Sequence, residues 1–377
     1  MLCLSMRRII SVRRNDFQRF STRSITNAID VHTHMYTPRY MEILKKRTDI
    51  PRVVELSNSD CRLVILPGED KDETTNIGRR IGAEYWNVDE KIRYMDLHGI
   101  KQSVISLANP WLDFLSGNEA ETIAQELNDE LQGICESSKG RLFGFAVLPI
   151  RNPSGSLREL QRLRSMRGSI KGVILGTPGA GLGLDDPQLR DVLHQIAQEK
   201  LLVFLHPHYG VGNEHYHNAG HALFLALGFP LETTVCVSRL IVSGVLDEVP
   251  GLRLLVAHAG AALPSLIGRL DSCVQHDIAI ARRLKQEPSA YLRSNMYFDA
   301  IAYSKPALAA LVDTVGGDRI MFGTDNPFFP PPGEEEKDVN GQLWPSTMKV
   351  FQTIEQFKDQ KLSDQILFRN AQSILGI

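Results

Sequence analysis

Cysteine is scarce in this chain of 377 residues, and its five cysteines are scattered. They form no close pair and stand at Cys3, Cys61, Cys135, Cys236 and Cys273. Neither a disulfide framework nor a zinc site built on cysteine is therefore expected. Such sparse usage is typical of proteins in a reducing compartment.

An excess of charge of either sign is also absent. The formal net charge is −2, so the chain lacks the basic footprint of a nucleic-acid-binding protein. No apolar run approaches the roughly 20 residues that a bilayer-spanning helix needs. We therefore expect no nucleic-acid partner and no membrane partner, and the composition is that of an ordinary globular protein.

The first 28 residues differ in composition from the rest. Asp16 is their only acidic residue, and arginine recurs at Arg7, Arg8, Arg13, Arg14, Arg19 and Arg23. An arginine-rich, acid-poor segment is typical of a mitochondrial transit peptide, whereas a secretory signal would continue into an apolar core. We expect residues 1–28 to lie outside the fold and to direct the protein to the mitochondrial matrix. The alternatives are a disordered leader or an upstream start codon on a cytosolic protein.

Eight apolar runs after this leader predict strands. They cover residues 29–34, 103–108, 142–148, 172–175, 201–206, 252–258, 296–299 and 319–324. Most are continuous rather than alternating, which favours parallel strands covered on both faces. Helical patterns lie between them, for example at 121–137, 156–166, 187–199 and 306–314. This alternation predicts an α/β fold, a (β/α)8 TIM barrel formed by a single domain over residues 29–377.

Two insertions interrupt the predicted barrel. Residues 36–90 follow the first strand, and their polar stretch 67–73 is predicted to be an exposed loop. Residues 207–232 follow the fifth strand and are rich in histidine, glycine and aromatic residues. Both insertions come after strands, on the face where barrels of this type place their active sites.

Histidines and an aspartate stand at the ends of four predicted strands. His32 and His34 end the first, and because side chains alternate along a strand the two imidazoles share one face. His206, His258 and Asp325 follow the fifth, sixth and eighth strands. The carboxyl ends of parallel barrel strands meet at one mouth, so the sequence predicts a single site there.

Three histidines with one carboxylate form a ligand set suited to Zn²⁺, with a coordination position left open. We expect His32, His34, His206 and Asp325 to supply it; His208 competes with His206, but the strand-end position favours His206. His258 is interpreted either as a ligand or as a proton shuttle. The irregular spacing of the remaining histidines of the second insertion, His215, His217 and His221, favours loop polarity or substrate contacts.

A second metal ion is not expected. Two-metal hydrolases of this architecture use a carboxylated lysine at the end of the fourth strand, but here that strand ends on Leu175 and Gly176. Lys171 stands at its beginning, on the wrong side of the barrel. The prediction is one metal ion per chain.

Five long segments carry a resemblance to a known family. They are IDVHTHMY at 29–36, VISLANPW at 104–111, LVFLHPHYG at 202–210, LGFPLETT at 227–234 and FGTDNPFFP at 322–330. The chain resembles the amidohydrolase superfamily, and within it the metal-dependent decarboxylases related to aminocarboxymuconate-semialdehyde decarboxylase. It is most similar there to the fungal enzymes acting on uracil-5-carboxylate (isoorotate). The resemblance runs from Ile29 to the C-terminus and leaves out the leader.

The resemblance implies that His32, His34, His206 and Asp325 hold a zinc ion, with His258 beside metal and substrate. It assigns Asn109 and Arg79 to polar groups of the substrate, with the adjacent Arg80 as an alternative to Arg79, and it places Phe328 against the substrate ring. Asn326 departs from the family, in which histidine is expected after the aspartate. We also expect a homodimer and no organic cofactor.

These observations predict a metal-dependent, non-oxidative decarboxylase of a small aromatic or pyrimidine carboxylate, with a uracil-5-carboxylate-like substrate. In one route Asp325 protonates the ring carbon before CO₂ departs, and His258 stabilises or relays charge. In the other, metal-activated water, deprotonated with His258 as base, adds to the substrate first.

The alternative function is a mononuclear zinc amidohydrolase or deaminase. Such deaminases carry a glutamate close after an active-site histidine, but Ala259 and Ala261 follow His258 here. A non-catalytic metal-binding barrel is the third hypothesis.

Overall fold

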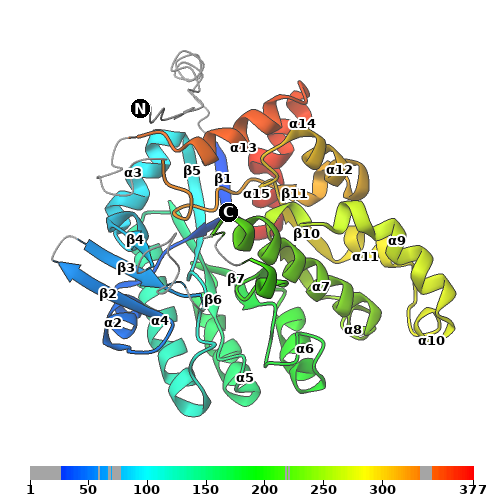
Figure 1. Cartoon of the computed structure of the whole chain (residues 1–377), viewed down its shortest axis with the longest axis horizontal. Coiled ribbons are helices and arrows are strands. Elements are labelled where there is room, and N and C mark those ends of the chain that lie inside the picture. The colour runs from blue at the N-terminus through cyan, green and yellow to red at the C-terminus, as the bar shows by residue number, and fades with distance from the viewer. Residues whose placement is uncertain are drawn as a thin grey trace, which may run out of the picture.

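The computed structural model describes residues 27–57, 60–66, 69, 78–216, 219, 221–331 and 342–377. Eight parallel strands form one sheet in the middle of the molecule (Figure 1). They are β1 (Ala28–His34), β5 (Ile100–Ser106), β6 (Leu142–Val147), β7 (Ile170–Gly176), β8 (Leu202–His206), β9 (Arg253–Val256), β10 (Met296–Asp299) and β11 (Ile320–Met321). The sheet holds the strands in this same order, as consecutive βα units produce.

The sheet closes on itself through backbone hydrogen bonds between its first and last strands. The amide of Val31 donates to the carbonyl of Phe322 at 3.0 Å. Three residues further along β1, the amide of His34 donates to the carbonyl of Asn326 at 2.8 Å. A closed ring of eight parallel strands is a (β/α)8 barrel, so the predicted fold is confirmed.

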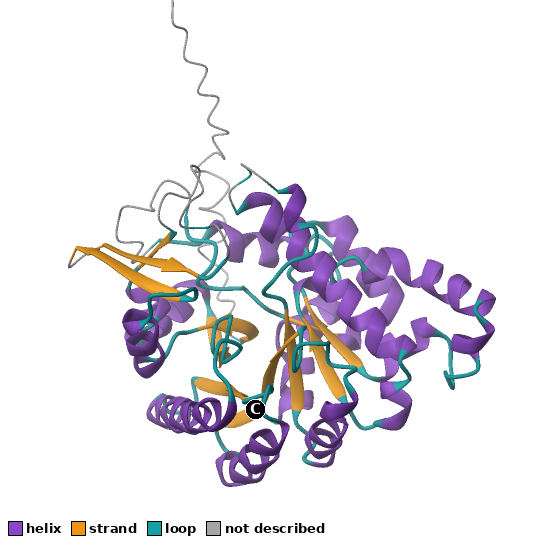
Figure 2. Ribbon diagram, turned by 60° about the horizontal axis from the view of Figure 1, so that its bottom comes forward, coloured by secondary structure: helices purple, strands orange, loops and turns teal. Residues whose placement is uncertain are grey.

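Helices connect the strands and surround the barrel (Figure 2). They are α2 (Pro38–Lys46), α3 (Val88–His98), α4 (Gly117–Ser137), α5 (Pro153–Arg162), α6 (Arg190–Gln198), α7 (Phe229–Val242), α8 (Val245–Glu248), α9 (Leu263–His276), α10 (Ile278–Ala281), α11 (Pro288–Ser294), α12 (Lys305–Val315), α13 (Pro345–Glu355), α14 (Gln360–Asp364) and α15 (Asn370–Leu375). Local signals fix their ends. For example, the Asn87 side chain accepts two first-turn amides of α3, and Gly99 ends that helix in the left-handed conformation.

Two strands that lead to predicted site residues end earlier than the sequence predicts. The eighth strand was expected over residues 319–324, but β11 covers only Ile320–Met321. The chain then turns, so that the amides of Thr324 and Asp325 both reach the carbonyl of His32, at 3.1 and 2.8 Å. Likewise β9 stops at Val256, and His258 begins a short 3-10 turn.

The first insertion is folded, which the sequence did not predict. It contains α2 and a separate antiparallel sheet of β2 (Arg52–Ser57), β3 (Asp60–Val64) and β4 (Arg79–Ile81), at the left in Figure 1. The predicted exposed loop is wrong at Glu69, whose exposure is only 4%. The rest of the stretch 67–73 lies outside the described residues, as do residues 1–26 of the predicted leader.

One helical segment, Phe224–Val242, is long and apolar enough to cross a membrane by length and composition alone. Half of it is buried inside the structure. Val237, Leu240 and Ile241 belong to the hydrophobic core around the barrel. Packing on the barrel accounts for the apolar character of these residues.

Candidate active site

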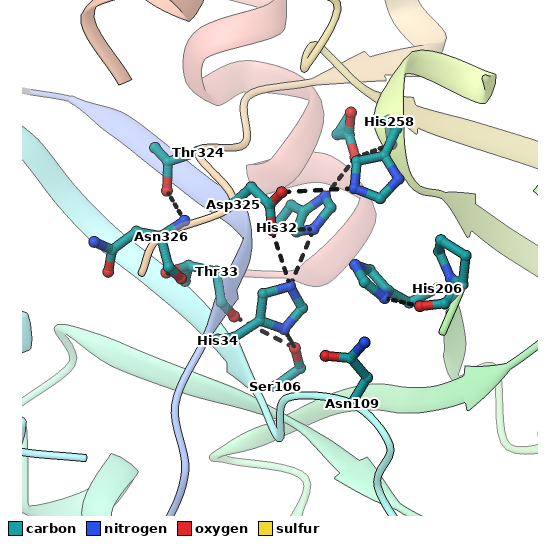
Figure 3. Close-up of polar contacts among 12 residues, drawn as sticks. His32, Thr33, His34, Ser106, Asn109, His206, His258, Thr324, Asp325 and Asn326 are labelled. Atoms are coloured by element: carbon teal, nitrogen blue, oxygen red, sulfur yellow. Dashed lines mark hydrogen bonds and ion pairs between the residues drawn. The ribbon is translucent and has the colours of Figure 1, made fainter. Parts of the chain in front are cut away.

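Side chains from the ends of β1, β8, β9 and β11 converge at the mouth of the barrel (Figure 3). Ligand atoms of His32, His206, His258 and Asp325 all lie within 4.8 Å of one another. Nε2 of His34 is 3.1 Å from Nε2 of His32 and 3.4 Å from Oδ1 of Asp325. The structure therefore brings together all five residues that the sequence placed at one site.

Three of the imidazoles are held from behind, so that each turns Nε2 toward the centre. The partners of the Nδ1 atoms are Asp299 Oδ2 for His32 (2.6 Å), Ser106 Oγ for His34 (2.9 Å) and the Pro207 carbonyl for His206 (2.8 Å). A carbonyl can only accept, so Nδ1 of His206 carries the proton and Nε2 presents a lone pair. Fixing one ring nitrogen in this way is how proteins orient metal-binding histidines.

Asp299, at the end of β10, is a site residue that the sequence interpretation missed. Its Oδ2 contacts His32 and also accepts the backbone amide of His258 at 2.8 Å, while its Oδ1 accepts the amide of Ala259 at 2.8 Å. One buried carboxylate thus orients both a histidine ring and the turn that carries another. The signal was available, because the run 296–299 ends on a carboxylate at the matching position of its strand.

The backbone at the two functional turns adopts an uncommon conformation. His258 and Asp325 have φ angles of 56° and 60°, in the left-handed region that non-glycine residues seldom occupy. Gly323 permits the close approach of the two strands, because a Cβ atom there would lie 2.7 Å from Cβ of His32. Such strain is tolerated where surrounding hydrogen bonds fix the chain.

The protonation of the cluster is set by burial and by its two carboxylates. Burial alone would lower the pKa of His32, but the charges of Asp299 and Asp325 raise it to about 10. Burial lowers the pKa of His34 to about 4 and that of His206 well below its usual value. Burial would raise the pKa of Asp325, but the charge of His32 and bonds from neighbouring histidines hold it well below the usual range.

A divalent cation suits this donor set. The positive charge between the carboxylates resides on His32, and a metal ion would take its place by displacing that proton. Nε2 of His206 is buried and has no hydrogen-bond partner among the residues that the structure describes. Imidazole nitrogens with one carboxylate are ligands typical of Zn²⁺ and related divalent metals.

A second buried polar network lies behind β1. Nζ of Lys91 donates to Thr33 Oγ1 at 2.8 Å and to Oδ1 of Asn326. The carboxylate of Asp30 accepts the amides of His32 and Thr324 at 3.1 and 3.2 Å. Asn326, where the sequence resemblance led us to expect histidine, therefore has a defined partner in this network.

The cluster opens into a cavity of about 710 Å³. The predicted substrate contacts Arg79, Asn109 and Phe328 all line it, together with His206, His258 and Asp325. Arg80, the alternative to Arg79, is not among its lining residues. A cavity of this size is typical of small-molecule sites.

Asn109, which lines the cavity, has a fixed partner. Nδ2 of Asn109 donates to Nδ1 of His208 at 2.8 Å. Burial lowers the pKa of His208 to about 3, so its ring is neutral and can accept. His208 thus orients Asn109 and, unlike His206, does not belong to the histidine cluster.

Lys171 lies near the start of β7, at the end of the strand away from the cluster. Its Nζ stands 4.9 Å from the centre of the Phe143 ring. It is therefore not placed to bridge two metal ions at the mouth.

The sequence profile of the amidohydrolase family matches residues 29–377, which include the whole barrel. The chain belongs to the amidohydrolase family. The resemblance inferred from the sequence motifs is confirmed.

Proteins similar to this member of the family include several decarboxylases. The isoorotate decarboxylase (IDCase) of Metarhizium anisopliae, solved in the apo form, has a TM-score of 0.87 and 40% identity, covering 93% of this chain and 97% of that chain. The 2-amino-3-carboxymuconate-6-semialdehyde decarboxylase of Dictyostelium discoideum is 26% identical over 355 residues, covering 93% of this chain and 91% of the relative.

A third structure shares the amidohydrolase fold at lower identity. It is a dihydroxybenzoic acid decarboxylase from Polaromonas, solved with bound manganese and the inhibitor 2-nitroresorcinol. Its TM-score is 0.70 at 21% identity, covering 93% of this chain and 97% of that chain. Within the family, the present chain is a decarboxylase, that is, a carboxy-lyase.

Proposed function

We propose that this protein is a metal-dependent, non-oxidative decarboxylase of a small ring carboxylate of the uracil-5-carboxylate type. One observation carries the proposal: the histidine and aspartate cluster stands in a cavity that also presents Arg79, Asn109 and Phe328. The cluster suits a metal-bound carboxylate, and the other three suit a polar, planar ring. The 40% identity to an isoorotate decarboxylase supports a pyrimidine substrate.

His32, His34, His206 and Asp325 would hold one zinc ion, with manganese as the alternative that a bound structure of similar fold supports. The four residues whose ligand atoms all lie within 4.8 Å of one another include His258 in place of His34. We keep His34 as a ligand because its Nε2 approaches the cluster while Ser106 fixes its Nδ1. A divalent metal would act there as a Lewis acid that orients the substrate carboxylate.

Asp325 is proposed to give a proton to the ring carbon, after which the carbon–carbon electron pair returns to the ring as CO₂ leaves. Because the pKa of Asp325 is held well below its usual range, this carboxylate must first receive a proton. His258 can supply it, since Nε2 of His258 lies 3.6 Å from Oδ2 of Asp325 and its side chain is 16% exposed. His258 therefore connects Asp325 to the solvent-accessible cavity.

Arg79, Asn109 and Phe328 are proposed to position the ring. The Arg79 guanidinium stands 5.4 Å from the centre of the Phe328 ring. The Phe328 ring in turn makes an edge contact with His34, at 5.4 Å between centres. A planar substrate held against Phe328 would therefore lie beside the metal cluster.

The test is the release of CO₂ from uracil-5-carboxylate and from 2,6-dihydroxybenzoate by purified protein whose metal content is measured. We expect one divalent ion per chain, loss of turnover on chelation and recovery on adding Zn²⁺ or Mn²⁺. Uracil-5-carboxylate should react faster than the benzoate. Ammonia release or hydrolysis without CO₂ would instead establish the amidohydrolase or deaminase alternative, and an inert metal-loaded protein would establish a binding barrel.

We further propose that the protein forms a homodimer in the mitochondrial matrix. The arginine-rich composition of residues 1–28 supports the location. Light scattering and subcellular fractionation test the two statements. A monomer, or full-length protein confined to the cytosol, would contradict them.

A further inference from the structure

Glu69 joins the two insertions of the barrel beside the cavity. Its Oε2 accepts the backbone amides of Ile65 and Leu66, at 2.7 and 3.0 Å. Its Oε1 lies 3.0 Å from Nε of Arg79 and 3.3 Å from Nδ1 of His221. Two backbone hydrogen bonds, two nearby side-chain nitrogens and an exposure of only 4% hold this carboxylate in place.

Arg79 and His221 reach the cavity from different parts of the chain. Arg79 stands on β4 in the first insertion, and His221 lies in the insertion after β8. Both line the same cavity as Asn109 and Phe328. Glu69 itself does not line it, so its effect on a ligand would pass through these two side chains.

Among the described residues at this wall of the cavity, the charges of Arg79 and Glu69 balance. Arg79 carries one positive charge at any accessible pH, and the ionised Glu69 beside it carries one negative charge. The wall therefore offers hydrogen-bond donors without a net charge, and a second carboxylate on the ligand would lose its hydration without gaining an unpaired cation in return.

We propose that Glu69 is a positioning residue that neutralises this wall, so that the site selects ligands with one carboxylate and a neutral acceptor over dicarboxylates. The proposal deepens the function proposed above, because it takes the first carboxylate to bind at the metal cluster. It adds a selectivity that the cluster alone does not provide.

Two matched ligands test this selectivity by calorimetry on the metal-loaded protein at pH 8. Isophthalate and 3-carbamoylbenzoate differ only in carrying a second carboxylate or a neutral amide at the same ring position. We expect the wild-type protein to bind 3-carbamoylbenzoate about tenfold more tightly than isophthalate, a difference that one uncompensated charge readily produces. Equal binding, or tighter binding of isophthalate, would overturn the proposal without any variant.

Three variants then separate charge from structure. Glu69→Gln leaves Arg79 unneutralised, so the preference should shift toward isophthalate by roughly tenfold. Glu69→Asp keeps the charge and should keep the wild-type order, even where both ligands weaken. Glu55→Gln is the control, because Glu55 lies in the same insertion but is exposed and pairs with Lys45 at 2.6 Å.

The outcomes remain separable from those of the decarboxylase assay. If Glu69→Gln does not fold, the relative affinities of the two ligands for the wild-type protein and for Glu69→Asp still test the proposal. A matching shift in Glu69→Gln and Glu69→Asp would show a structural role and overturn the proposal. CO₂ release with the opposite ligand order refutes the selectivity alone, whereas the expected order without CO₂ release refutes the decarboxylase alone. Failure of both ligands to bind would refute the selectivity alone, because CO₂ release decides the decarboxylase separately.

Discussion

The barrel and its insertions build their parts of the site in different ways. The metal-site residues stand at or just after barrel strands, so their places follow mainly from the strands, as when the amide of Asp325 bonds to the carbonyl of His32. The insertions place Arg79 and His221 through side-chain contacts with Glu69. The first arrangement can change little without opening the barrel, whereas the second can change by single substitutions.

This difference suggests a division of tasks. Reaction chemistry needs groups held within a fraction of an ångström, which rigid elements provide. Substrate choice needs surfaces that vary, which connecting segments after barrel strands provide. We therefore expect substitutions at strand ends to reduce the rate and substitutions in the insertions to change affinity.

The largest effect is expected from Asp325→Asn at a strand end. Asparagine keeps an oxygen for the metal but cannot cycle a proton, so kcat should fall by about 10²–10⁴. Turnover and metal content measured on one sample check this. His258→Asn should also slow turnover while keeping nearly all the metal. If Asp325→Asn retains both metal and near-normal turnover, the route in which His258 activates water becomes the better account.

Asp299→Asn should have a smaller effect, because Asp299 acts through His32 and the turn at His258. Loss of a carboxylate that orients a metal-binding histidine costs about 10–100-fold in metal affinity or activity. Metal titration followed by turnover at saturating metal separates the two losses. Unchanged metal affinity and rate would show that the contact at 2.6 Å is not needed.

A substitution in an insertion should instead change substrate affinity. Arg79→Lys retains the charge but loses the planar guanidinium beside Phe328, so KM should rise about tenfold, or about 1.4 kcal/mol. The value of kcat should change much less. Steady-state kinetics with uracil-5-carboxylate provide the measurement. A loss confined to kcat would place Arg79 with the reacting groups and break the division proposed here.

Stability at the junction between the two regions should depend on pH. Asp113 accepts from the hydroxyl of Tyr209 in the second insertion, at 3.0 Å, and burial raises its pKa to about 6, above an unfolded value near 3.8. Its contribution is thus full below pH 3.8 and is lost as the pH rises through 6. Asp113→Asn should stabilise the fold by about 1–2 kcal/mol at pH 8 and not at pH 4. Urea unfolding at both pH values tests the sign.

The smallest effect is expected from removing the residues before Ala28. They precede β1 and have the composition of a targeting segment. Turnover, metal content and thermal unfolding should equal those of the full chain. A misfolded product would show that the boundary at residue 28 is wrong.

The sequence allowed the barrel and its cluster to be predicted for one physical reason. Parallel strands covered on both faces are continuous apolar runs, and their carboxyl ends meet, so the residue after each run could be assigned to the mouth. Asp299 fits the same rule and was overlooked. His258 departs from this rule only slightly, because it stands two residues beyond Val256, where β9 ends.

The insertions could not be predicted in this way. The strands β2 and β3 are short and mix charged with apolar residues, so their sequences show neither the helical nor the strand period of apolar residues. Glu69 lies in a polar stretch that is typical of a loop, yet contacts with Arg79 and His221 bury it. His221 is far from Glu69 in the sequence, and the residues between Glu69 and Arg79 follow no regular pattern. Local sequence does not reveal such pairings.

The seam between β1 and β11 also has a consequence for biosynthesis. His32 lies on the first strand and Asp325 follows the last one, so almost the whole barrel is translated between them. A nascent chain therefore carries two histidines of the cluster long before the aspartate leaves the ribosome. Its affinity for a metal ion should stay low during most of translation, and stable loading should follow closure of the ring.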